Sequence, residues 1–231
     1  IHLGEPPKEF LWQWRDKNDT FHRDGLITPR GFFNRYVKVD LDSMVCLINC
    51  PTEDKPYNKV YTIQYLGNVI EGEVIRYLNV DLSVFKKAAV DTLKSGEPVW
   101  FGCDVGKNLE RDLGILDASL YDYELVYGSP FRADKAQRVD YGDSMMSHAM
   151  VFTGVDLGES GNPKKWRVEN SWGDKIGDKG YLVMSDAWFD EYMYEVVVPR
   201  KFISPELLSV LQEEPVILPP WDPMGALAAA E

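Results

Sequence analysis

A succession of short β-type segments fills the second half of the chain and constrains its fold more than any other feature. An apolar run spans residues 149–155, and alternating apolar and polar residues follow at 165–170 and 180–184. A short aromatic stretch, 187–194, lies in the same β-rich region, and residues 195–198 form a last apolar segment. Runs of this length, alternation and β-branched content predict the strands of a sheet.

The first half of the chain adds helices to this pattern. Residues 81–96 form the clearest predicted helix, because the apolar residues recur on one face and Gly96 is a fitting stop. Thr28 and Pro29 predict a second helix start, as cap and first-turn residue. Further strands are predicted at 45–48, 59–65 and 98–105. A chain that mixes helices and strands in this way belongs to the α+β class.

Two regions are less regular. Residues 106–147 are punctuated by glycine and proline, with helical potential only within 116–127. Near the C-terminal end, Ser204 predicts the cap of a short helix over 205–211. The prolines of 215–223 are incompatible with a helix, so the last part of the chain is expected to be an extended arm.

Charge and hydropathy narrow the classes of function. The formal net charge of −12 and the lack of a Lys/Arg run disfavour nucleic acid as a partner, because an acidic surface repels phosphate. No stretch approaches the roughly 18 apolar residues of a membrane span, and no signal peptide is visible. The chain does not begin with methionine, so we expect it to start partway through a longer protein, although a processed mature chain would look the same.

The cysteines give no sign of a disulfide framework or a metal site. There are three of them, Cys46, Cys50 and Cys103, and an odd, sparse set is unlike a disulfide scaffold. The first two are separated by one residue too many for the usual redox pair, and no His or Cys cluster lies nearby to complete a zinc site. We therefore expect buried, inert thiols, and neither a metal nor a cofactor.

A histidine and an asparagine stand at the ends of two neighbouring predicted strands. His148 precedes the strand 149–155, and Asn170 ends the strand 165–170, 22 residues further on. One strand, a loop and a return strand fit this separation, so the pairing is expected to set the two side chains side by side. Imidazole has a pKa near neutrality and can activate a thiol, provided that an acceptor such as a carboxamide oxygen orients the ring.

These residues also carry a resemblance that extends over nearly the whole chain. The run Asn-Ser-Trp-Gly at 170–173 resembles the asparagine motif of papain-like peptidases. The longer stretch 166–173 is similar to the bleomycin hydrolase family of papain-superfamily cysteine peptidases, as are 98–107, 194–198 and 217–227. The resemblance implies a papain-like α+β fold, of which this chain supplies mainly the β-barrel-like lobe and part of a helical insertion.

The resemblance also implies a role for each residue of the pair. His148 corresponds to the catalytic histidine and Asn170 to the asparagine that orients it, while Trp172 shields their hydrogen bond from water. Nothing in the chain matches the family's cysteine motif, so no nucleophile is assigned and the thiol is expected outside this chain. An alternative stays open, namely a catalytically inactive assembly or binding module of the same fold.

The family pattern divides the chain into three parts. Residues 1–58 are expected to end the helical insertion and form its junction, residues 59–200 to form the β-rich lobe, and residues 201–231 to form a helix and an arm directed into the cleft. In the family the C-terminus limits cleavage to peptides with free N-termini, which assigns that role to Ala230 and Glu231. The resemblance further implies peptide substrates and a cytoplasmic homohexamer.

Overall fold

The computed structural model describes residues 7–67, 72–130 and 133–225. The chain divides between Asp42 and Ser43 into two compact units. This division precedes the boundary near residue 58 that the sequence suggested, because the segment that follows Ser43 enters the sheet of the larger unit. Within the described residues, no helix combines the length and apolar character that a membrane span needs.

The smaller unit is a β-hairpin packed on a short helix. It contains β1 (Phe10–Arg15), β2 (Phe21–Ile27) and α1 (Pro29–Phe32), followed by a π-helical turn at Phe33–Val37. The predicted cap is confirmed, because Thr28 Oγ1 accepts a hydrogen bond from the Gly31 amide at 3.0 Å. Alternate residues of β1 point to the same face of the hairpin. On the face that carries Trp12, the centroid of its ring lies 4.7 Å from that of Phe32. The polar and aromatic sequence of residues 7–27 gave no strand signal, so the hairpin was not predicted.

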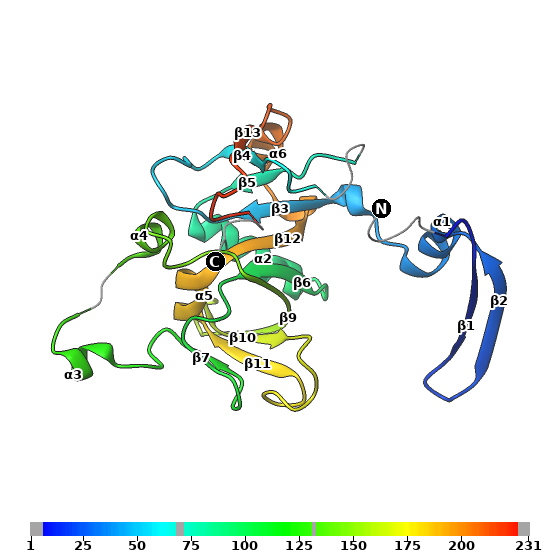
Figure 1. Ribbon diagram of the computed structural model, residues 1–231, viewed down its shortest axis with the longest axis horizontal. Coiled ribbons are helices and arrows are strands. Elements are labelled where there is room, and N and C mark those ends of the chain that lie inside the picture. Colours follow the sequence, from blue (N-terminus) through cyan, green and yellow to red (C-terminus); the bar gives the residue numbers. More distant parts are fainter. Residues whose placement is uncertain (1–6, 68–71, 131–132, 226–231) are drawn as a thin grey trace. The chain divides into compact units, whose positions relative to one another are not determined.

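The larger unit is built around one mixed sheet (Figure 1). Its strands are β3 (Met44–Ile48), β4 (Lys59–Ile63), β5 (Tyr77–Asn79), β6 (Val99–Cys103), β7 (Leu109–Glu110), β8 (Ile115–Leu116), β9 (His148–Leu157), β10 (Pro163–Glu169), β11 (Tyr181–Ser185), β12 (Met193–Pro199) and β13 (Val216–Leu218). In the described residues they form the order β13-β4-β5-β3-β12-β6-β9-β10-β11-β8-β7. The predicted α+β class is confirmed by this sheet and its helices.

Helices cover and connect the strands. They are α2 (Leu82–Lys94), α3 (Tyr123–Tyr127), α4 (Lys135–Asp140), α5 (Asp186–Tyr192) and α6 (Pro205–Val210), with 3-10 turns at Leu41–Ser43 and Arg200–Phe202. The α2 helix was predicted, and Asp81 caps it by accepting hydrogen bonds from the amides of Ser83 and Val84 at 2.9 and 3.2 Å. The predicted cap of α6 is also confirmed, because Ser204 Oγ accepts from the Leu207 amide.

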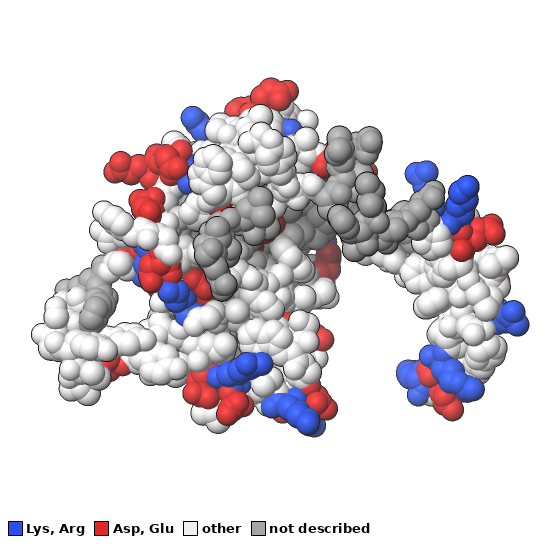
Figure 2. All heavy atoms as spheres, viewed as in Figure 1, with Lys and Arg blue, Asp and Glu red and all other residues white. Residues whose placement is uncertain are grey.

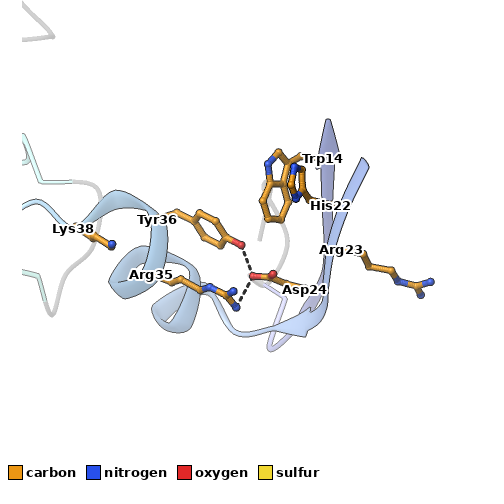
Figure 3. A pocket seen from close by; sticks show the side chains of 7 residues that line it. All are labelled: Trp14, His22, Arg23, Asp24, Arg35, Tyr36 and Lys38. Atoms are coloured by element: carbon orange, nitrogen blue, oxygen red, sulfur yellow. Dashed lines mark hydrogen bonds and ion pairs between the residues drawn. The ribbon is translucent and has the colours of Figure 1, made fainter. Parts of the chain in front are cut away.

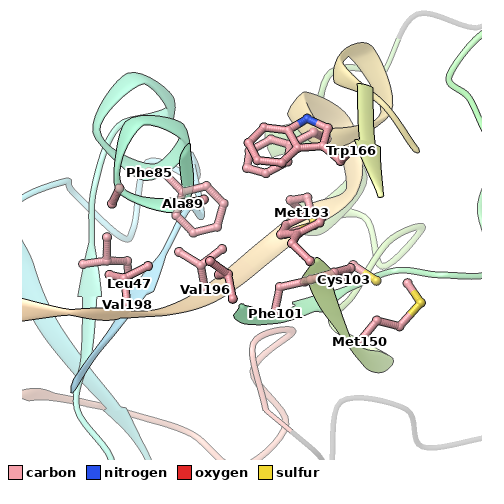
Figure 4. Packing of buried hydrophobic residues seen from close by; sticks show 14 of the residues in the cluster. Leu47, Phe85, Ala89, Phe101, Cys103, Met150, Trp166, Met193, Val196 and Val198 are labelled. Atoms are coloured by element: carbon pink, nitrogen blue, oxygen red, sulfur yellow. The ribbon is translucent and has the colours of Figure 1, made fainter. Parts of the chain in front are cut away.

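The core lies between α2, α5 and the central strands. Figure 4 shows Phe85 and Ala89 of α2 facing Leu47, Val196 and Val198 of the sheet. The α5 helix was not expected, since its sequence lies within the β-rich stretch 187–194. It forms because Ser185 Oγ caps the Trp188 amide, and because its aromatic residues recur at a helical spacing that buries one face against the sheet.

A buried carboxyl in β12 makes the stability of this core depend on pH. Glu195 is 4% exposed, and burial raises its pKa from 4.5 to about 7. Between these values the unfolded chain has released the proton while the folded chain retains it, so the free energy of unfolding falls as pH rises from 4.5 to 7. The loss amounts to about 3 kcal/mol once both states are ionised.

Glu195→Gln should therefore remove most of this pH dependence. We expect the variant to match the wild-type protein near pH 4.5 and to exceed its free energy of unfolding by about 1–3 kcal/mol at pH 8. Urea denaturation at several pH values measures the difference. Glu159→Gln, on an exposed turn, is the matched control and should leave the pH profile unchanged. Parallel profiles for Glu195→Gln and wild type would contradict the prediction.

Candidate active site

Two antiparallel strands bring His148 and Asn170 together. His148 is the first residue of β9, and Asn170 directly follows the last residue of β10. Because β9 and β10 run antiparallel, with Val151 paired to Glu169, the start of one lies beside the end of the other. His148 Nε2 lies 3.0 Å from Asn170 Oδ1, which confirms the juxtaposition predicted from the sequence.

A second contact fixes the orientation of the Asn170 carboxamide. Its Oδ1 atom also accepts a hydrogen bond from the Ser171 amide at 2.8 Å, so the oxygen must face this corner of the site. The imidazole therefore donates its Nε2 proton to Oδ1, and the lone pair of the neutral ring lies on Nδ1. The Asn170 Nδ2 atom is buried and has no hydrogen-bond partner among the described residues. The ring is thus held in the tautomer that can accept a proton at Nδ1.

An indole packs beside the His148 ring. The rings of Trp172 and His148 lie 5.0 Å apart at an angle of 33°. The Arg111 guanidinium lies 5.1 Å from the centroid of the same indole, in a cation–π contact. No sequence signal pointed to the indole contact, because Arg111 and Trp172 are far apart in the chain.

None of the cysteines is placed as an activated nucleophile. Burial, together with the nearby Glu195 carboxyl, raises the pKa of the Cys46 thiol to about 12. Burial also raises the pKa of Cys50 and, well above its usual value, that of Cys103. Cys103 pairs with His148 across β6 and β9, but its side chain is 0% exposed and lies in the core beside Phe101 (Figure 4). These three thiols are held in the protonated, unreactive form.

The C-terminal arm approaches the segment that precedes His148. After β13 the chain makes a turn in which Asp222 is bound by the buried Lys55, with Nζ and Oδ2 3.1 Å apart. The Met146 amide donates to the Pro223 carbonyl at 3.4 Å, only two residues before His148. Ala230 and Glu231, the residues predicted to limit substrate length, lie outside the described residues.

A separate hollow in the smaller unit presents no comparable chemistry. It has a volume of about 630 Å³ and is lined by Trp14, His22, Arg23, Asp24, Arg35, Tyr36 and Lys38 (Figure 3). Its central carboxylate, Asp24, pairs with Arg35 at 2.7 Å and accepts a hydrogen bond from the Tyr36 hydroxyl. In the part of the chain that the structure describes, no three His, Cys, Asp or Glu side chains gather as metal ligands.

The fold and the site together define a class. An α+β sheet whose strand ends present an oriented imidazole, a carboxamide and an adjacent indole is the arrangement of a papain-type cysteine peptidase lobe. The pattern that defines the Peptidase C1-like family matches residues 1–225. The chain belongs to this family, and the resemblance predicted from the sequence is confirmed.

Individual relatives agree with this assignment. Aminopeptidase C of Listeria monocytogenes is 50% identical over 226 residues, covering 98% of this chain and 51% of the relative. Human bleomycin hydrolase is 48% identical over 233 residues, covering 99% of this chain and 51% of the relative. The crystal structure of PepW from Lactobacillus rhamnosis HN001 superposes with a TM-score of 0.91 at 50% identity, covering 97% of this chain and 51% of that one. The chain spans about half the length of the curated relatives it matches.

Proposed function

We propose that this chain supplies the histidine–asparagine half of the active site of a cysteine aminopeptidase. The observation that carries the proposal is the 3.0 Å contact between His148 Nε2 and Asn170 Oδ1, which leaves Nδ1 free to accept a proton. The nucleophilic thiol is none of the three cysteines of this chain, all of which have raised pKa values. The proposal therefore includes a thiol from outside these residues.

The reaction is amide hydrolysis through a thioester. His148 Nδ1 takes the thiol proton, and the thiolate attacks the carbonyl carbon of the scissile amide. The imidazolium then gives its proton to the leaving amine as the C–N bond breaks, which leaves an acyl thioester. In the second half His148 removes a proton from water, hydroxide attacks the thioester, and the thiol is regenerated as the acid departs. Asn170 holds the ring through both halves, and Trp172 keeps water from their hydrogen bond.

A substrate pair and a thiol reagent test this function in the complete gene product. Leucyl-4-nitroanilide should be hydrolysed, and its N-acetylated form should not. Iodoacetamide should abolish the activity by alkylating one cysteine, and peptide mass spectrometry should find Cys46, Cys50 and Cys103 unmodified at that point. Loss of activity that tracks with alkylation of any of these three would refute the proposed nucleophile. A protein without hydrolytic activity would favour the alternative of an inactive binding module.

The C-terminal arm is proposed to restrict this activity to free N-termini. The Asp222 turn and the Met146–Pro223 hydrogen bond direct the arm towards the segment before His148. A terminal carboxylate at Glu231, with Ala230 beside it, would attract the α-ammonium of a substrate and obstruct longer chains on that side. The names of the aminopeptidase C relatives are consistent with this restriction.

Deletion of residues 226–231 should convert the enzyme towards internal cleavage. We expect the ratio of N-acetyl-peptide to free-peptide hydrolysis to rise by at least about tenfold, because both the charge and the obstruction are lost. Mass spectrometry of digested peptides measures the cleavage positions. Glu231→Gln keeps the chain length and the terminal carboxylate, so it serves as the control and should remain an aminopeptidase. A cleavage pattern unchanged by the deletion would reject the role of the arm.

We infer that residues 1–58 contain the end of a helical insertion and its junction, with the lobe beginning where the chain enters the large sheet after Ser43. Residues 59–200 would form the rest of the catalytic lobe and 201–231 carry the arm, in a cytoplasmic homohexamer. The net charge of −12 argues against nucleic acid as a partner. On the face that Figure 2 shows, lysines and arginines lie among acidic side chains. Light scattering of the complete gene product tests the hexamer.

A further inference from the structure

A buried carboxylate accepts hydrogen bonds from the segment that precedes His148. Asp104 follows the last residue of β6 and is 7% exposed. Its Oδ2 atom accepts hydrogen bonds from Ser144 Oγ at 2.8 Å and from the Met145 amide at 3.4 Å. Its Oδ1 atom accepts from Ser147 Oγ at 3.3 Å. One side chain therefore binds the residues before His148 at three points.

The contacts of Asp104 extend into the core. Ser144 is 1% exposed, and its hydroxyl donates to Asp104 while accepting from the Tyr194 hydroxyl at 2.7 Å. The Asp104 amide donates to the Tyr192 carbonyl at 3.0 Å, which anchors it to the α5–β12 junction. Within the described residues, no ion pair involves Asp104, so serine hydroxyls and a backbone amide solvate the carboxylate. Hydrogen bonds to a carboxylate are stronger than those between neutral groups, so these contacts hold the segment firmly.

Asp104 and its serine partners lie next to the residues that position His148 beside Asn170. Cys103, next to Asp104, pairs with His148 across β6 and β9, and the Ser147 amide donates to the Cys103 carbonyl at 3.0 Å. A slip of one residue at this point would turn His148 to the other face of the sheet and separate it from Asn170. The start of β9 must therefore be held in one register. Ser144 and Ser147, which precede it, are held by donating hydrogen bonds to Asp104.

We propose that Asp104 is a positioning residue that sets the register and ring orientation of His148 by clamping the segment Ser144–Ser147. Its effect on catalysis depends on the function proposed above, whereas its effect on the His148–Asn170 hydrogen bond does not. Among the described residues, Asp104 makes no hydrogen bond to the His148 imidazole, so it would act through the segment that it binds. Loss of the Asp104 hydrogen bonds should therefore lower kcat by displacing the His148 ring, and it should leave KM nearly unchanged.

Kinetics of two variants test the clamp in the complete gene product. Asp104→Ala should lower kcat about 100-fold, as expected for a small misplacement of a catalytic group, with KM changed less than about twofold. Asp104→Asn retains one acceptor and should lower kcat about tenfold. Asp117→Asn is the matched control, because Asp117 Oδ1 likewise binds a serine, Ser119, through its amide at 2.9 Å and hydroxyl at 2.7 Å. The control should match wild type.

A spectroscopic measurement separates this inference from the proposed function. The proton on His148 Nε2 should give a slowly exchanging imidazole NMR signal, assigned by its loss in His148→Ala. Asp104→Asn should accelerate its exchange at least about tenfold, whereas Asp117→Asn should not. Unchanged exchange together with wild-type kcat in Asp104→Asn would overturn the inference. If the protein lacks peptidase activity, the proposed function fails, and the exchange rate alone tests whether Asp104 positions His148. If Asp104→Ala does not fold, Asp104→Asn provides the test.

Discussion

Replacing His148 with alanine should lower kcat/KM by at least about 1,000-fold, which corresponds to about 4 kcal/mol of lost transition-state stabilisation. The variant removes the base that takes the thiol proton and the acid that protonates the leaving amine. The fold should survive, because His148 is only half-buried at a strand end and, among the described residues, its side chain is hydrogen-bonded only to Asn170. Steady-state hydrolysis of leucyl-4-nitroanilide, with circular dichroism as a check on folding, measures the effect.

Two further variants sharpen this prediction. His22→Ala removes a histidine that is also hydrogen-bonded, but to Asp16, at 3.0 Å. Its kcat/KM should equal that of wild type if the loss is specific to the histidine that pairs with Asn170. Asn170→Ala leaves the base in place and removes only its acceptor, so we expect a smaller loss of about 100-fold. Activity retained within tenfold in His148→Ala would exclude the proposed mechanism.

Replacing Lys55 with methionine should lower the free energy of unfolding by about 3–5 kcal/mol. Lys55 and Asp222 form an ion pair whose side chains are 3% and 6% exposed. Removal of the ammonium leaves the Asp222 carboxylate buried and without its counter-ion. The arm turn that Asp222 organises, with the Met224 amide donating to Oδ1 at 2.9 Å, should loosen first. Urea denaturation gives the overall loss, and hydrogen exchange of the Met224 amide locates it.

An exposed ion pair provides the comparison for Lys55. Lys201 and Glu97 lie 2.6 Å apart with side chains 57% and 45% exposed, so Lys201→Met should cost no more than about 1 kcal/mol. In the double variant of Lys55→Met with Asp222→Asn, the uncompensated charge is gone and part of the stability should return. Equal losses for Lys55→Met and Lys201→Met would show that burial does not govern the strength of this pair.

Local signals in the sequence account for the elements that were predicted. The helix α2 carries its cap, Asp81, and its apolar face within one short window, so neighbouring residues specify it. The strands β6 and β9 are apolar runs of the length that buried strands need. The His148–Asn170 contact was predictable for the same reason, because a strand, a loop and a return strand between them impose antiparallel pairing.

Two elements were missed for different reasons. The hairpin of β1 and β2 has apolar residues on both faces, such as Leu11, which is 46% exposed, so its alternation is obscured. The helix α4 lies within the stretch interpreted as irregular. It is held by the buried Lys135 ammonium, which donates to Asn49 Oδ1 at 2.7 Å, and that partner is 86 residues away. Pattern reading does not detect a partner at such a distance.

The sequence by itself determined the α+β class, the family, and the pairing of an imidazole with a carboxamide, because each depends on short motifs or on the period of adjacent residues. Only the tertiary structure decided that Asp104 grips Ser144 and Ser147, 40 and 43 residues away, and that Lys55 neutralises Asp222 beneath the arm. Such contacts depend on burial and on which chain segments meet, and those follow from the packing of the whole sheet.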